Sequence, residues 1–153
     1  MRVGPRVAHT TDRTDGSHVL LAVCSIAAGV IHVAVVPQHL EEDRVFGVFF
    51  ILTAGLQIAW AMRVLFAPSA IIYSAGALAN GALIGAWVVL RTMGLPIGPH
   101  LWMPEPARAL DVTASLLELL LVVGSLVLVR RWIHVDGYDA SGDRLEREDQ
   151  VCV

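Results

Sequence analysis

The chain has 153 residues, 56% of them hydrophobic, and a formal net charge of −3. Its mean hydropathy of +0.64 argues against a water-soluble globular domain, whose core could not hide so much apolar surface. The negative charge disfavours a nucleic-acid partner, and Cys24 and Cys152 lack the spacing of a disulfide framework or a thiol oxidoreductase.

Four apolar stretches are long enough to cross a bilayer as helices, which takes about 20 residues each. They cover residues 19–36, 45–66, 70–90 and 109–129. Pro37 follows the first stretch, and segments containing Pro or Gly separate the others. The sequence therefore predicts an all-α integral membrane four-helix bundle with up-down-up-down topology, spanning residues 19–132 after an N-terminal segment of residues 1–18.

The first stretch follows three arginines, Arg2, Arg6 and Arg13, as the core of a secretory signal would. It is longer than such a core, however, and no small-x-small cleavage site follows it. We therefore expect this helix to remain in the mature protein.

Arginines concentrate on one predicted side of the membrane, before the first span, at Arg63 and at Arg130-Arg131. The other side carries Arg44, Arg91 and Arg108 beside a group of acidic residues. Because cytoplasmic segments hold the excess of positive charge, we predict both termini on the cytoplasmic side of the plasma membrane. The C-terminal segment, residues 133–153, is acidic and poor in apolar residues, which predicts a disordered cytoplasmic tail.

Each predicted span carries a polar residue that lipid would not tolerate: His32, Gln57, Asn80 and Glu118. Their distribution predicts one shared intramembrane pocket that binds a ligand and opens outward, with His39, His100, Glu105 and Asp111 at its entrance. On the third span, Gly81 and Gly85 predict the close approach of another helix.

Several chemistries could use such a pocket. A buried Glu118 near His32 could hold or conduct a proton, or the two could form a structural hydrogen bond that fixes helix register. His32, His39, His100 and Asp111, with Glu105, are also candidate ligands for a divalent metal such as zinc or copper, although their spacing matches no metal motif. A bis-histidine haem is disfavoured, since His32 alone lies well inside a span.

No nucleophile with a base and no nucleotide motif is evident, so we predict no catalytic residues and favour a protein that is not an enzyme. The pocket hypothesis is a small membrane protein that binds or conducts a proton, metal ion or small ligand. The alternative is a non-catalytic accessory or scaffold subunit, whose polar residues pack helices against a membrane-protein partner or a second copy.

Three segments together resemble a group of small bacterial four-helix membrane proteins with no established activity. These segments are Ala28–His32 with Pro37–His39, Phe46–Phe50 with Gln57, and Trp87 with Arg91–Pro99. The resemblance covers nearly all of residues 18–130. It implies the four-helix architecture and brings no function with it.

Overall fold

A computed structural model of the chain describes residues 16–94, 96 and 101–151, with side chains up to His134. The described residues form four helices and no strand: α1 (Ser17–Glu42), α2 (Arg44–Phe66), α3 (Ala70–Thr92) and α4 (Ala109–Val151). Each is long and apolar enough to cross a membrane, α4 through its portion Ala109–His134. The predicted all-helical membrane bundle is confirmed.

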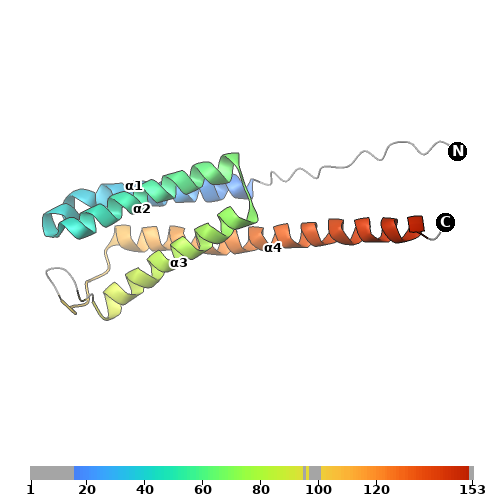
Figure 1. The fold of residues 1–153 in the computed structure, drawn as a ribbon. Coiled ribbons are helices and arrows are strands. Elements are labelled where there is room, and N and C mark those ends of the chain that lie inside the picture. Colours follow the sequence, from blue (N-terminus) through green and yellow to red (C-terminus); the bar gives the residue numbers. More distant parts are fainter. Residues whose placement is uncertain (1–15, 95, 97–100, 152–153) are drawn as a thin grey trace.

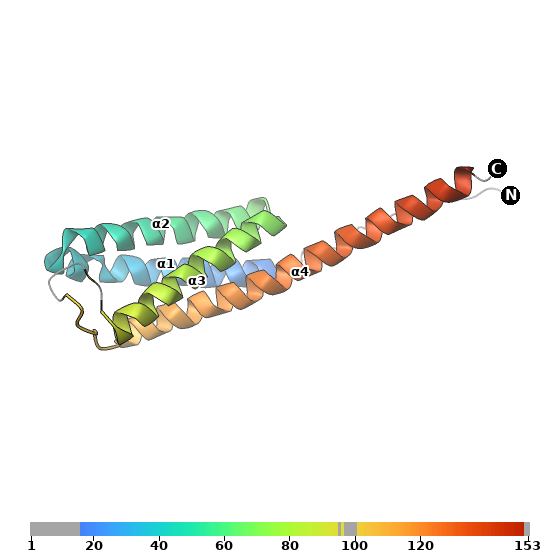
Figure 2. The ribbon, with the colours of Figure 1, turned by 60° about the horizontal axis from the view of Figure 1, so that its bottom comes forward.

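The bundle consists of two helix pairs. α1 packs most extensively against α2, and α3 against α4, while α1 and α4 join the pairs and α2 barely touches α3 (Figures 1 and 2). At one end of the bundle lie Asp43, which connects α1 to α2, and the long segment between α3 and α4. We call it the loop end (Figure 1). The opposite end, where α1 begins and residues 67–69 connect α2 to α3, is the turn end.

Short connections with capping side chains reverse the chain. The carboxylate of Asp43 accepts the N–H of Val45 at 2.8 Å and so caps the start of α2. The hydroxyl of Ser69 accepts the N–H of Ile72 at 3.3 Å at the start of α3. Both caps satisfy backbone donors that a helix start leaves free, which is required where no water can replace them.

Contact between α2 and α3 is concentrated near the turn end. The indole N–H of Trp60 donates to the carbonyl of Ile72 at 2.8 Å. The ring of Trp60 lies so close to Gly76 that a Cβ atom there would clash with it. Only a residue without a side chain permits that approach. By contrast, Gly81 and Gly85 have nothing within 4 Å of an added Cβ. The predicted close approach at that pair does not occur among the residues that the structure describes.

Helix α1 extends beyond its predicted end. It continues through Pro37 to Glu42, whereas the sequence predicts a span that ends at residue 36. Pro37 has no N–H to donate to the carbonyl of Val33 and therefore costs one helical hydrogen bond, which the last turns of a membrane helix tolerate. As a result, His39 is a helical residue rather than part of a loop.

Helix α4 also differs from the expected tail. It continues to Val151, well beyond the bundle, through the segment for which the sequence predicts disorder (Figures 1 and 2). No proline lies between Ala107 and Val151, and Arg and Glu, which are frequent near its end, are good helix formers. The low apolar content that predicts disorder does not prevent a helix from extending out of a stable bundle.

Candidate functional site

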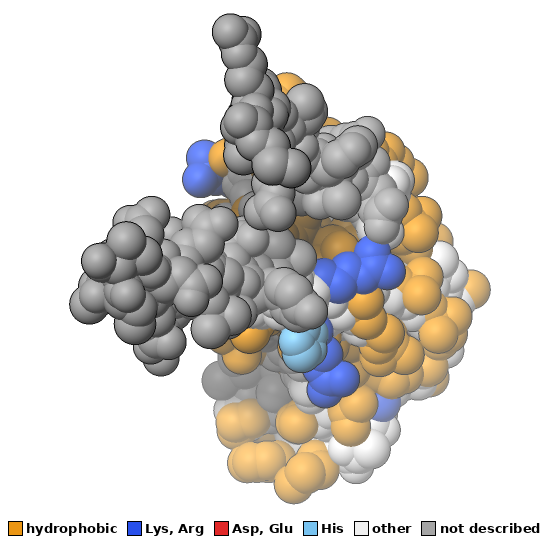
Figure 3. Space-filling model, turned by 90° about the vertical axis from the view of Figure 1, so that its right-hand side faces the viewer, with side chains coloured by type: hydrophobic (Ala, Val, Ile, Leu, Met, Phe, Trp, Pro, Cys, Tyr) orange, Lys and Arg blue, Asp and Glu red, His pale blue; other side chains and the backbone are white. Residues whose placement is uncertain are grey.

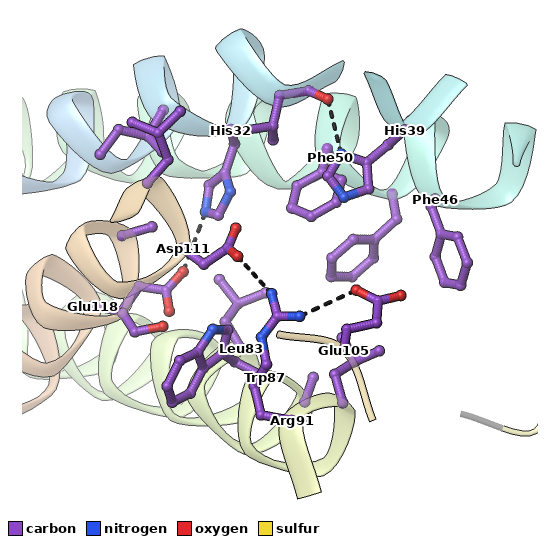
Figure 4. A pocket seen from close by; sticks show the side chains of 18 of the residues that line it. His32, His39, Phe46, Phe50, Leu83, Trp87, Arg91, Glu105, Asp111 and Glu118 are labelled. Carbon is purple, nitrogen blue, oxygen red and sulfur yellow. Dashed lines mark hydrogen bonds and ion pairs between the residues drawn. The ribbon is translucent and has the colours of Figure 1, made fainter. Parts of the chain in front are cut away.

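A buried pair of ionisable side chains joins α1 to α4. His32 is 6% exposed and Glu118 is 2% exposed. The imidazole Nε2 of His32 lies 3.2 Å from Oε1 of Glu118 (Figure 4). A proton between these atoms belongs to the imidazole when the carboxylate is ionised and to the carboxyl group when it is not. The pair can thus hold one proton in either arrangement.

Small residues allow α1 and α4 to place this pair inside the bundle. Ala28 on α1 is buried, as is Ala114 one turn before Glu118 on α4, and a Cβ added to Gly124 of α4 would meet the side chain of Leu21 on α1. A carboxylate or imidazole facing hydrocarbon would cost on the order of 3 kcal/mol, so each side chain gains from turning toward the other. The close packing of α1 against α4 and the contact between His32 and Glu118 therefore favour the same orientation of each helix about its axis.

Aromatic packing holds the histidines of α1. The ring of Phe50 on α2 lies 5.6 Å from that of His32 and 4.2 Å from that of His39, between centroids. His39 Nδ1 lies 2.8 Å from the carbonyl oxygen of Val35. Because a carbonyl only accepts, Nδ1 must carry the proton, and Nε2 is the acceptor in the neutral ring.

A cavity of about 300 Å³ lies between the two helix pairs toward the loop end and reaches the buried pair (Figure 4). All four helices line it. Its polar wall comprises His32, His39, Arg91, Glu105, Asp111, Ser115 and Glu118. Its aromatic wall comprises Phe46, Phe49, Phe50 and Trp87, and aliphatic side chains complete the lining.

Arg91 at the end of α3 organises the mouth of the cavity. Its Nη2 donates to Asp111 at 2.6 Å and its Nη1 to Glu105 at 3.1 Å (Figure 4). The side chain of Arg91 is 15% exposed, so these ion pairs are partly shielded from water. Asp111 also accepts the backbone N–H of Arg108 at 3.1 Å. The network ties α3, the following segment and the start of α4 together.

Two nitrogen donors of α3 in the residues that line the cavity have no partner. Trp87 Nε1 and Arg91 Nε are buried and make no hydrogen bond within the described part of the chain. The residues are four apart and lie on one face of the helix. A buried donor without an acceptor costs about 1–3 kcal/mol, which an acceptor atom of a bound molecule would relieve.

The remaining polar residues of the spans form a separate chain. The hydroxyl of Ser25 donates to Oε1 of Gln57 at 2.6 Å, and Gln57 Nε2 donates to Oδ1 of Asn80 at 2.8 Å. Asn80 Nδ2 then donates to the carbonyl of Gly76 at 2.8 Å. These residues join α1, α2 and α3 and do not line the cavity. Their satisfied hydrogen bonds indicate a role in packing.

The structure thus divides the predicted site. His32, Glu118, His39 and Asp111 line one cavity, whereas Gln57 and Asn80 lie in the separate chain. His100 lies outside the described residues. Among the residues that are described, no three His, Cys, Asp or Glu side chains come close enough to hold a metal ion.

From the sequence alone, neither the aromatic wall nor Arg91 is assigned to the site. Phe49 and Phe50 lie three and four residues after Phe46, on one face of α2. Apolar residues that face lipid show the same spacing, so the spacing does not identify a cavity wall. Arg91 was counted only as a charge at a membrane boundary, although a cation just after a span and close to acidic residues is a signal for pairing.

Comparisons with known proteins add no relative to this description. No family model, curated protein or solved structure matches the chain. The residues and the geometry of the cavity therefore indicate the function.

Proposed function

We propose that this multi-pass membrane protein binds a small, largely apolar molecule in the cavity between its helix pairs, with a polar group of the ligand against His32 and Glu118. The observation that carries the proposal is the cavity itself, about 300 Å³ in volume and ending at a buried acid–base pair. Pockets that take small molecules are mostly apolar with a few converging polar groups, and they begin at about this size.

The charge distribution supports a cavity whose mouth faces outward across the plasma membrane. Arg63, Arg130 and Arg131 are exposed at the turn end, and Figure 3, which views that end, shows arginines among apolar side chains. The loop end carries Arg44, Arg91 and Arg108. The sequence before α1 adds Arg2, Arg6 and Arg13, so the arginines associated with the turn end outnumber those of the loop end. This excess supports cytoplasmic termini under the positive-inside rule.

The test is to block the cavity without disturbing the core. Ala86 lines the cavity and is exposed at the bundle surface, so Ala86→Trp fills the space beside it. Ala82, one turn earlier on α3, is exposed and does not line the cavity, which makes Ala82→Trp the matched control.

Full-length wild-type protein and both variants are purified in mild detergent and extracted with organic solvent, and the extracts are compared by mass spectrometry. We expect a small molecule enriched with wild type and with Ala82→Trp but lost from Ala86→Trp. Identical extracts from all three proteins would contradict the proposal.

The alternative, an accessory or scaffold subunit, has one specific observation in its favour. The hydrogen-bond chain through Gln57 and Asn80 packs helices and takes no part in the cavity. If the polar residues serve packing alone, Glu118→Gln should change folding and nothing else. A folded Glu118→Gln protein with altered ligand content favours the binding function.

A further inference from the structure

The cavity has more negative than positive side chains. Glu105, Asp111 and Glu118 line it together with one guanidinium, that of Arg91. Both Nη atoms of Arg91 are engaged by Glu105 and Asp111. Glu118, by contrast, pairs in the cavity with the imidazole of His32 and not with the guanidinium. With neutral imidazoles and all three carboxylates ionised, the lining carries an excess of two negative charges.

The lining also contains aromatic rings. Phe49 packs edge-on against Phe50 with 5.4 Å between centroids, and Phe50 is held in turn by His39. Trp87 contributes its indole from α3 (Figure 4). The π face of an aromatic ring is negative, so rings attract a cation that is stripped of water. The carboxylates and the rings of the lining therefore favour the same sign of charge.

Two lining residues are exposed on the helices that make few contacts with each other. Phe49 on α2 is 44% exposed, and Ala86 on α3 is exposed as well. α2 and α3 touch little (Figure 2). This arrangement favours entry of a molecule from the bilayer between α2 and α3.

These features disfavour an anion and an inorganic cation. An anion would meet three carboxylates, with only the unpartnered Nε1 of Trp87 and Nε of Arg91 as free donors. An inorganic cation needs several oxygen or nitrogen ligands at once, and within the described residues no three His, Cys, Asp or Glu side chains come close enough to supply them. An organic cation with apolar substituents fits the carboxylates, the rings and the aliphatic side chains of the lining.

We infer that the ligand of the cavity is a lipophilic organic cation, a quaternary ammonium or protonated amine whose charge lies between Glu118 and the aromatic wall. This inference rests on the proposed function and adds the chemical class of its ligand. Glu118 supplies the charge attraction, Phe49 and Trp87 the cation–π contacts, and the aliphatic lining accommodates the substituents.

The test uses two probes of the same shape and different charge. Benzyltrimethylammonium is compared with neopentylbenzene, in which carbon replaces the quaternary nitrogen. Dissociation constants are measured by ligand-observed NMR titration of the full-length protein in detergent micelles, with empty micelles as the blank. We expect wild type to bind the cation about tenfold or more tightly than the neutral isostere, and Glu118→Gln to remove most of that preference.

Phe49→Leu is the second variant, since it keeps Glu118 and its pairing with His32 in place. It should weaken binding of the cation several-fold and leave binding of the neutral probe nearly unchanged. Equal affinities for the two probes, a preference that survives Glu118→Gln, or no measurable binding of the cation would each overturn the inference. The comparison of Ala86→Trp with Ala82→Trp tests the proposed function separately. If the molecule lost from Ala86→Trp is neutral, the inference of a cationic ligand is contradicted and the proposed binding function is not.

Discussion

His32 and Glu118 are 86 positions apart in the sequence, and their side chains meet at 3.2 Å inside the bundle. This contact joins the first helix to the last. It also places an acid–base pair at the inner end of a cavity whose other walls are aromatic and aliphatic. A contact that only fixed helix register would not require a cavity beside it.

The strength of this contact can be measured with a double-mutant cycle. His32→Phe, Glu118→Leu and the double variant are compared with wild type by reversible unfolding in detergent. Because polar pairs between membrane helices contribute about 0.6–2 kcal/mol, we expect a coupling energy in that range. A coupling energy indistinguishable from zero would mean that the two side chains do not interact.

Gln57→Leu tests the assignment of the second polar group to packing. The substitution leaves the carbonyl oxygen of Asn80 without its donor, whereas the Ser25 hydroxyl keeps its bond to the backbone carbonyl of residue 57. We expect a loss of about 1–3 kcal/mol in the free energy of unfolding, since the unpaired oxygen is buried. The control is Gln38→Leu, because Gln38 pairs at the surface with Glu42, and its loss should stay below about 0.5 kcal/mol. Equal losses for both variants would contradict the assignment.

Gly76 and Gly81 provide a matched pair on one helix. A methyl group at Gly76 meets the ring of Trp60, whereas one at Gly81 meets nothing within 4 Å. Gly76→Ala should therefore destabilise the protein by about 1–3 kcal/mol, as overpacking does. Gly81→Ala should be neutral or slightly stabilising, since alanine favours a helix more than glycine does. The midpoint of thermal unfolding in detergent distinguishes the two, and the reverse order would show that α2 and α3 pack differently.

The proposed orientation is tested by labelling single cysteines. Cys24 and Cys152 are replaced, and one cysteine is introduced either at Ala107 near the loop end or at Pro68 in the connection between α2 and α3, both exposed. A membrane-impermeant maleimide added to intact cells should modify Ala107→Cys and spare Pro68→Cys. Permeabilised cells, in which both should react, are the control. The opposite labelling pattern would invert the protein in the membrane.

The sequence predicts the helices well because lipid imposes a length and an apolar composition on each span. The second and third helices begin within one residue of the prediction, at Arg44 and Ala70. The end of α1 is predicted less well. Pro37 indicates a helix end by local sequence, but the loss of one hydrogen bond near a helix terminus is too small to stop the helix.

Which polar residues share a site is harder to predict. Inside a bilayer, lipid and protein interior are both apolar, so the apolar pattern does not fix how each helix is rotated. The sequence can identify His32, Gln57, Asn80 and Glu118 as residues that must avoid lipid. It cannot show that Gln57 bonds to Asn80 while His32 bonds to Glu118, because only the contacts between helices decide that pairing.

The most direct test of the account is the ¹⁵N NMR resonance of His32 Nε2 in the full-length protein labelled at its six histidines. His32→Gln assigns the resonance. If His32 pairs with Glu118 at the inner end of a ligand cavity, the resonance should shift in Glu118→Gln. It should also shift when benzyltrimethylammonium is added, and this second shift should be lost in Ala86→Trp but kept in Ala82→Trp. A His32 resonance that responds neither to Glu118→Gln nor to the probe would contradict the account.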